Sequence, residues 1–194
     1  MRTGTLIVLA GPSGVGKGSV VERLRSRDPE GLALSISATT RPMRPGEVDG
    51  DDYLFVDDAG FDRMIEAGEL LEWAEVYQGR RYGTPRTFVE RSLADGRDVL
   101  LEIDVQGARL VRERVPDSVL VFIAPPSEAE LERRLRERGT EDPDELRERL
   151  RVAFEDELPQ QAWFDHVVVN DDLARAADEV LAIIEAQRNE GSQT

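Results

Sequence analysis

The chain has 194 residues, of which 40% are hydrophobic and 34% are charged, values that are ordinary for a globular protein with one sizeable core. It contains no cysteine, which excludes disulfides and thiolate metal sites. The formal net charge of −15 argues against a general affinity for nucleic acid, although arginines placed in a cleft can still attract a nucleotide.

Four continuous apolar runs predict strands that are buried on both faces of a sheet. They are residues 5–10, 98–105, 118–124 and 166–170. Helical patterns lie between them: one helix opens at Lys17, Ser127 and Glu130 form a capping box for another, and the last begins at about Leu173. Buried strands that alternate with helices predict an α/β fold with a parallel sheet.

Residues 35–87 interrupt this alternation. The runs "DDYLFV" and "LLEWAEVYQGRRYGT" are typical of shorter, half-exposed strands, and an amphipathic helix is expected around Phe61, Met64 and Ile65. We interpret this segment, called the insertion below, as an antiparallel unit that follows the second core strand.

The segment "GPSGVGKGSV", residues 11–20, follows the first buried strand and opens a helix, which is the setting of a phosphate-binding loop. Glycines let the backbone N–H groups approach phosphate oxygens, the helix N-terminus adds partial positive charge, and Lys17 can reach the β- and γ-phosphates. A glycine-rich turn without a ligand is the alternative, which the spacing disfavours. The nucleotide-binding residues expected here are Gly11, Pro12, Ser13, Gly14, Val15, Gly16, Lys17, Gly18 and Ser19.

Gly18 stands where most phosphate loops carry the hydroxyl that binds Mg²⁺. Ser19 follows one position later, and we expect it to reach the metal ion or one of its waters. The ending "GKGS" is similar to the "GKGT" of adenylate kinases, in which magnesium is held mostly through water.

Arg41 and Arg44 are three residues apart, so that two guanidinium groups can converge on one phosphate, and Tyr53 supplies a hydroxyl donor nearby. At these residues the chain resembles guanylate kinases, which are ATP:GMP phosphotransferases of the P-loop nucleoside monophosphate kinase family. The matching segments, which together span nearly the whole chain, are "GPSGVGK", "SISATTRPMRPGEVDGDDYLF", "GELLEWAEV", "YGT", "EIDVQGA", "FIAPPS", "RGTE" and "VVVND".

The resemblance implies a GMP site within and beside the insertion. A carboxylate accepts a hydrogen bond from guanine N1–H but would face the lone pair on N1 of adenine, so such a site rejects the wrong base. A solvated Glu72, and tyrosines that only pack between strands, are the alternatives. The implied contacts are Arg41, Arg44, Tyr53 and Tyr82 for the phosphate, Glu72 and Asp104 for N1–H and the 2-amino group, and Ser37 and Thr84 for the O6 and N7 edge.

Glu102 and Asp104 stand at i and i+2 at the end of the predicted strand 98–105, so their carboxylates point to the same face. Open α/β sheets bind ligands at the carboxyl ends of their strands, and both carboxylates can therefore border the cleft. The resemblance implies that Glu102, together with Ser19, holds Mg²⁺ through water. Two solvated carboxylates are the alternative.

Residues 126–158 carry many arginines and glutamates at helical spacing, and most of these charges are expected to form solvated pairs. The resemblance implies that this segment is a helical lid over the phosphates. The residues that it implies for ATP are the lid arginines Arg134, Arg138 and Arg149, and Asn170 beside the adenine; Lys17, Arg44, Arg138 and Arg149 would stabilise the transferred group.

On this interpretation the chain is a single domain over residues 1–194. The core comprises about 1–34, 88–125 and 159–190, the insertion at 35–87 binds GMP, and the lid spans about 126–158. The expected reaction moves the γ-phosphate of ATP, bound with Mg²⁺, to GMP, with dGMP as a further candidate. The expected partners are these small molecules, with no nucleic acid and no membrane.

Two other functions fit parts of the pattern. One is a non-catalytic module like the guanylate-kinase-like domains of membrane-associated scaffolds, and the other is a P-loop kinase for a different small molecule. The presence of Lys17 and of the whole expected GMP site disfavours both. No apolar run approaches the roughly 20 residues of a membrane span and the N-terminus lacks the pattern of a signal peptide, so a cytoplasmic protein is expected.

Overall fold

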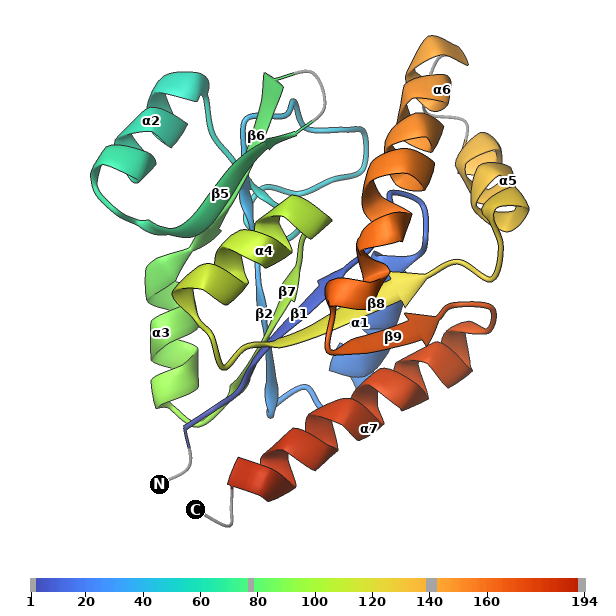
Figure 1. Ribbon diagram of the computed structural model, residues 1–194. Helices are drawn as coiled ribbons and strands as arrows, with labels where there is room; N and C mark the ends of the chain where they lie inside the picture. The colour runs from blue at the N-terminus through green and yellow to red at the C-terminus, as the bar shows by residue number, and fades with distance from the viewer. Residues whose placement is uncertain (1–2, 77–78, 139–142, 192–194) are drawn as a thin grey trace.

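The computed structural model describes residues 3–76, 79–138 and 143–191, with the side chains of Arg138, Glu145 and Glu190 outside this description. A central sheet carries helices on both faces (Figure 1). Two further units rise from one end of this sheet: the insertion, which has a sheet of its own, and a group of helices that lies between β8 and β9 in the chain.

Five parallel strands form the central sheet, in the order β2-β7-β1-β8-β9. The register pairs Leu9 of β1 with Glu102 of β7 and with Val121 of β8, so the carboxyl ends of these strands lie side by side. The four predicted strands are confirmed, but the run 98–105 is a strand only as far as Glu102, because Asp104 caps the next helix. The bounds are β1 Leu6–Ala10, β2 Leu32–Ser35, β7 Asp98–Glu102, β8 Val119–Ala124 and β9 His166–Val169.

Alternate side chains of β1 enter two separate cores. Ile7 and Leu9 belong to a buried cluster with α1 and α7, whereas Leu6 and Val8 belong to one with α3 and α4. Because helices cover both faces of the sheet, every position of the strand is apolar, which confirms the α/β fold class. These helices are α1 Lys17–Arg27, α3 Arg86–Ala94, α4 Val105–Arg114 and α7 Leu173–Gly191.

The insertion contains a smaller sheet in the order β4-β3-β6-β5, with a helix, α2, packed on it. Strands β3 and β5 both pair antiparallel with β6, as predicted, but β3 and β4 are parallel. The reason is the long loop at 40–53, which returns the chain to the end of the sheet at which β3 begins, so that β4 runs in the same direction. The bounds are β3 Ala38–Thr39, β4 Leu54–Phe55, α2 Asp58–Glu66, β5 Leu70–Val76 and β6 Arg80–Pro85.

The segment between β8 and β9 is helical. Ser127 Oγ accepts a hydrogen bond from the N–H of Glu130 at 3.2 Å, which is half of the expected capping box. The other half is not formed, because the carboxylate of Glu130 accepts from Arg133 and Arg134 instead. The elements are α5 Glu128–Arg138, α6 Pro143–Arg151, a π-helix η2 at Val152–Glu157 and a 3₁₀-helix η3 at Leu158–Trp163.

A network of ion pairs joins three elements at the amino end of β7. Arg188 of α7 donates from Nε to Asp98 and from Nη2 to Asp28, each at 2.6 Å. Asp98 is only 1% exposed, and its other oxygen accepts from the N–H of Thr5 at 2.8 Å. This network lies at the opposite end of the sheet from the carboxyl ends of the strands.

In the ranges that the structure describes, no helix has both the length and the apolar character of a membrane span.

Candidate active site

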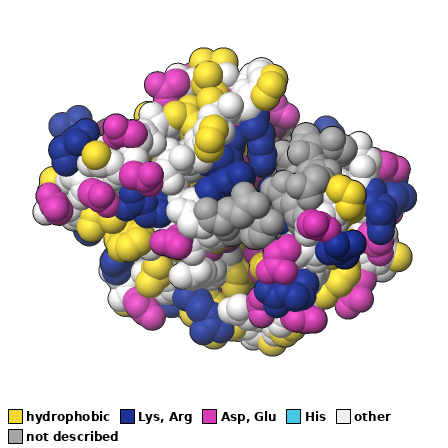
Figure 2. Space-filling model, turned by 90° about the horizontal axis from the view of Figure 1, so that it is seen from above, with side chains coloured by type: hydrophobic (Ala, Val, Ile, Leu, Met, Phe, Trp, Pro, Cys, Tyr) yellow, Lys and Arg dark blue, Asp and Glu magenta, His cyan; other side chains and the backbone are white. Residues whose placement is uncertain are grey.

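A cleft of about 1140 Å³ opens at the carboxyl ends of β1 and β7, between the insertion and helices α5 and α6. A site for one small molecule has roughly 300–1,000 Å³, so this cleft has room for two ligands. Figure 2 looks onto this end of the molecule and shows Lys and Arg side chains in its central hollow. The predicted site residues that line the cleft are Gly11, Ser13, Gly14, Gly16, Lys17, Gly18, Ser19, Ser37, Arg41, Arg44, Tyr53, Glu72, Tyr82, Glu102, Asp104, Arg134 and Arg149.

Glycine is required at two positions of the phosphate loop. Gly14 has a φ of +83° and Gly16 a φ of +95°, a left-handed conformation that other residues rarely adopt. The space is also taken, because a Cβ would come within 2.6 Å of Leu135 Cδ2 at Gly14 and of Asn170 Nδ2 at Gly16. The loop therefore keeps its shape only with these glycines.

Lys17 is the first residue of α1 and reaches back across the loop. Its Nζ donates to the carbonyl oxygens of Gly11 at 2.6 Å and Pro12 at 3.2 Å. No acidic residue stands in the first turn of α1, so its N-terminal N–H groups and the lysine together form a site for an anion.

The loop is supported from behind by Asn170 and Arg134. Asn170 Nδ2 donates to the Val15 carbonyl at 2.8 Å, and Arg134 donates to the same carbonyl at 3.2 Å and to the Asn170 carbonyl at 3.0 Å. Asn170 is only 5% exposed. Both residues, expected at the ATP site, thus contact the backbone of the loop, and Arg134 also lines the cleft.

Ser13 connects the loop to the helical segment. Its hydroxyl accepts from Arg149 of α6 at 3.0 Å, and its N–H donates to the carboxylate of Glu157, the last residue of the π-helix. Burial raises the pKa of Glu157 to about 7, against the opposing effect of Lys17. Sequence reasoning missed Glu157, since no local motif shows that a π-helix brings it to the loop. The side chain of Arg138 lies outside the described residues.

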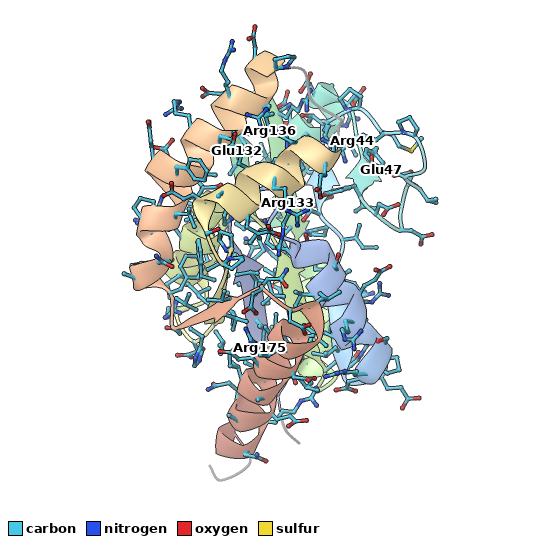
Figure 3. All side chains as sticks on the ribbon, turned by 90° about the vertical axis from the view of Figure 1, so that its right-hand side faces the viewer. Arg44, Glu47, Glu132, Arg133, Arg136 and Arg175 are labelled. Carbon is cyan, nitrogen blue, oxygen red and sulfur yellow. The ribbon has the colours of Figure 1, made fainter. Side chains whose placement is uncertain are left out.

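Arg41 and Arg44 lie at the insertion side of the cleft, with Glu47 between them. Arg41, which is 4% exposed, donates to both oxygens of Glu47 at 3.0 and 2.7 Å. The backbone N–H of Arg44 donates to Glu47 at 2.7 Å, and Figure 3 labels Arg44 and Glu47 beside each other. Burial alone would raise the pKa of Glu47, but the Arg41 pair outweighs it and the net direction is downward. Glu47 therefore stays ionised, orients the Arg41 guanidinium and holds the backbone at Arg44. Sequence reasoning did not assign a role to Glu47, although it lies in the quoted segment "SISATTRPMRPGEVDGDDYLF". A buried arginine such as Arg41 needs a carboxylate partner of this kind.

Two tyrosines complete this group. The rings of Tyr53 and Tyr82 meet edge to face with centroids 6.0 Å apart, and the Arg41 guanidinium lies 5.1 Å from the Tyr53 ring centroid. Burial raises the pKa of Tyr53 to about 12, so its hydroxyl keeps its proton and remains a donor. Two guanidinium groups and two phenols at one place suit a phosphate monoester.

Glu72 and Asp104 line the inner end of the cleft, whereas Thr84 is fully buried behind Glu72 and does not line it. Glu72 is 3% exposed, and its Oε1 accepts from the Thr84 hydroxyl at 2.6 Å. Burial raises the pKa of Glu72 to about 7, and the nearby Asp104 adds to the rise. Asp104 is the N-cap of α4 and accepts from the N–H of Gly107 at 2.7 Å. Two acceptors in a dry pocket suit a ligand edge that carries several N–H donors.

Glu102 lies beside the start of α1. A Cβ at Gly18 would stand 3.6 Å from both of its carboxylate oxygens, and Ser19 lines the same cleft. Burial raises the pKa of Glu102, while Lys17 opposes the rise. Among the described side chains no group of three carboxylates, histidines or cysteines encloses a metal site. A carboxylate and a hydroxyl nevertheless fit Mg²⁺, which keeps most of its waters and takes few protein ligands beside phosphate oxygens.

Most arginines of α5 are paired along the helix, as predicted. Arg133 donates to Glu130 and Glu137, and Arg136 donates to Glu132 at 2.6 Å, all on an exposed face (Figure 3). Exposed pairs of this kind contribute little to stability.

Comparison with known proteins identifies relatives over nearly the whole chain. A family model described as "Guanylate kinase" matches residues 3–187. A guanylate kinase of Thermobifida fusca is 56% identical over 93% of this chain and 91% of its own length, and one of Leifsonia xyli is 58% identical over 92% and 70%. A solved structure of a guanylate kinase from Anaplasma phagocytophilum is similar with a TM-score of 0.80 and 36% identity, covering 96% of this chain and 87% of that one.

Proposed function

The chain belongs to the guanylate kinase family, the nucleoside monophosphate kinases that phosphorylate GMP, and on this premise we propose how its cleft transfers the γ-phosphate of ATP to GMP. The single observation that carries the proposal is the composition of the cleft. A phosphate loop lies on one side, a group of arginines and tyrosines on the other, and a pair of carboxylates at the inner end.

ATP binds on the phosphate loop in this proposal. The backbone N–H groups and Lys17 contact the β- and γ-phosphates, and Lys17 exchanges its bonds to the loop carbonyls for phosphate oxygens. Asn170 and Arg134 keep the loop in shape through their hydrogen bonds to the Val15 carbonyl.

GMP binds on the insertion side. Its phosphate lies against Arg44 and against Arg41, whose guanidinium Glu47 orients, and the hydroxyls of Tyr53 and Tyr82 donate to it. Its base enters the inner end.

There the carboxylates of Glu72 and Asp104 accept from N1–H and the 2-amino group. Ser37 lines the cleft beside the remaining edge of the base, and the buried Thr84 contacts that edge only if its hydroxyl is shared between Glu72 and the base. Adenine presents a lone pair at N1 and is rejected.

The reaction is an in-line displacement. An oxygen of the GMP phosphate attacks the γ-phosphorus of ATP, the bond from that phosphorus to the β–γ bridging oxygen breaks, and ADP and GDP are released. The protein contributes mainly position and positive charge. Lys17, Arg44 and Arg149, with Arg138 from the same helical segment, stabilise the charge that spreads over the transferred group.

Ser19 and Glu102 hold Mg²⁺ through water in this proposal, which suits Gly18 at the position of the usual hydroxyl ligand. When bound, Mg²⁺ neutralises charge on the β- and γ-phosphates. Because two anions must meet with little water between them, the insertion and the α5–α6 segment close over the substrates. Arg149 then leaves the Ser13 hydroxyl for the γ-phosphate.

We include dGMP as an acceptor, since none of the assigned contacts uses the ribose 2′-hydroxyl, and we place the reaction in the cytoplasm, where both nucleotides are available. The test is a panel of acceptors (GMP, dGMP, AMP and dTMP) with ATP and Mg²⁺, followed by chromatography of the products. GMP is expected to react fastest. Faster turnover of AMP or dTMP would overturn the assignment of the base site.

A further inference from the structure

Gly107 lines the cleft at its inner end, in the first turn of α4. A Cβ built on it would lie 3.2 Å from Glu72 Oε2, 3.3 Å from Ile103 Cδ1 and 3.6 Å from Asp104 Oδ1. The place where a side chain would begin is therefore bordered by one oxygen from each of the two carboxylates that face this end of the cleft.

The backbone does not explain a glycine here. Gly107 lies within a helix, and its φ is not in the left-handed region, unlike those of Gly14 and Gly16. Glycine is the poorest helix former after proline, so nearly any other residue would make a more stable first turn. The structure offers space as the reason for glycine, at the inner end of the cleft where α4 meets Glu72 of β5.

The chemistry of that space is specific. A ligand atom that packs against Gly107, beyond the place where a Cβ would stand, has Glu72 Oε2 and Asp104 Oδ1 as its neighbours, and carboxylate oxygens are hydrogen-bond acceptors. An atom that binds favourably there must donate to these acceptors. A small amino group with two N–H bonds does so, whereas a methyl group would cover both carboxylates without a partner.

We propose that the space beside Gly107 receives the exocyclic 2-amino group of guanine, and that Gly107 sets the preference for GMP over purine monophosphates that lack this group. The inference rests on the proposed function, since it takes the base to lie against Glu72 and Asp104. It adds that selection occurs through an absent side chain as well as through the carboxylates.

The experiment compares GMP with inosine monophosphate (IMP), whose base differs only in lacking the 2-amino group. The unaltered protein is expected to prefer GMP by at least about 10-fold in kcat/KM, because a buried acceptor is left without a donor when IMP binds. Gly107→Ala is expected to lower kcat/KM for GMP by at least about 10-fold more than for IMP, with the KM for ATP unchanged. Gly107→Ser is expected to shift the preference further toward IMP, since its hydroxyl donates to a carboxylate.

Gln106→Ala is the matched control, because Gln106 is exposed on the same turn of α4 and is not among the residues that line the cleft. Its kinetics are expected to equal those of the unaltered protein. Thermal unfolding of Gly107→Ala is measured beside the kinetics, because alanine suits the helix better but its Cβ would stand only 3.2 Å from Glu72 Oε2 and 3.3 Å from Ile103 Cδ1. The ratio of the GMP and IMP rates is then compared on the folded variant.

If Gly107→Ala lowers kcat/KM equally for GMP and IMP, or lowers neither, the inference is overturned. The proposed function still stands in that case, provided that the unaltered protein phosphorylates GMP. Equal use of GMP and IMP by the unaltered protein would overturn the inference without any variant. Failure of the unaltered protein to phosphorylate GMP at all would instead refute the proposed function.

Discussion

Replacing Glu72 by glutamine is expected to change stability and substrate recognition in opposite directions. The substitution keeps the shape of the side chain and a carbonyl oxygen that accepts from Thr84, but it removes the charge. Glu72 is 3% exposed, and burial raises its pKa from 4.5 to about 7. Asp104 adds to this rise, and Arg114 opposes it.

The size of the stability effect follows from the pKa. In the folded chain Glu72 holds its proton more tightly than in the unfolded chain, so its stabilising contribution is complete below about pH 4.5 and is lost as the pH rises to about 7. A shift from 4.5 to about 7 corresponds to about 3 kcal/mol lost by pH 8. Glutamine has no charge to bury, so Glu72→Gln is expected to be more stable than the unaltered protein at pH 8 and equally stable at pH 4.5. For a chain of this length, 3 kcal/mol is roughly 6–12 °C in Tm.

The effect on activity has the opposite sign. In the proposed complex glutamine retains one acceptor for guanine but presents an N–H₂ group to a second donor, and hydrogen bonds to charged groups contribute about 1.5–3 kcal/mol each. The expected loss of kcat/KM for GMP is roughly 10- to 10²-fold, with the KM for ATP unchanged.

The assay is thermal unfolding without nucleotide at pH 4.5, 6, 7 and 8, combined with steady-state kinetics at pH 8. A gain in Tm that grows with pH, together with lost GMP turnover, is the expected result. A difference in Tm that does not change with pH, or a destabilised variant at pH 8, would refute the account of Glu72.

Three further predictions test other parts of the molecule. Arg188→Met leaves the buried carboxylate of Asp98 without the guanidinium of Arg188. The free energy of unfolding, measured in urea, should fall by about 2–4 kcal/mol, with activity per folded molecule unchanged. A loss below about 0.5 kcal/mol would contradict the role given to this ion pair. Ser19→Ala should raise the Mg²⁺ concentration needed for half-maximal rate without changing the KM for GMP, and an unchanged Mg²⁺ titration would remove Ser19 from the metal site. Arg149→Met should reduce kcat by roughly 10²-fold or more with a small change in the KM for ATP, while a kcat within twofold would mean that its bond to Ser13 is only structural.

The sequence was most informative where a pattern is local. The apolar runs located four of the five strands of the central sheet but not the short β2, and the glycines of residues 11–16 located a loop whose φ values only glycine adopts readily. The strand that contains Glu102 was predicted three residues too long, because apolar periodicity does not show that Asp104 turns to cap α4. The parallel pairing of β3 with β4 depends on the path of a long loop, which no short pattern predicts.

Within the site, the residues that the sequence missed act through tertiary contacts. Glu47 lay inside a recognised segment, and the rule that a buried arginine needs a carboxylate would have found it. Glu157 reaches Ser13 only because α6 continues into a π-helix, and the meaning of Gly107 appears only when β5 brings Glu72 beside α4.

A crystal structure of the protein with GMP, Mg²⁺ and a non-hydrolysable ATP analogue tests the central claim most directly. The account predicts the guanine base between the carboxylates of Glu72 and Asp104, with its phosphate against Arg41 and Arg44 and the triphosphate on the loop around Lys17. A guanine base outside the inner end of the cleft, or a GMP phosphate that contacts neither arginine, would contradict it.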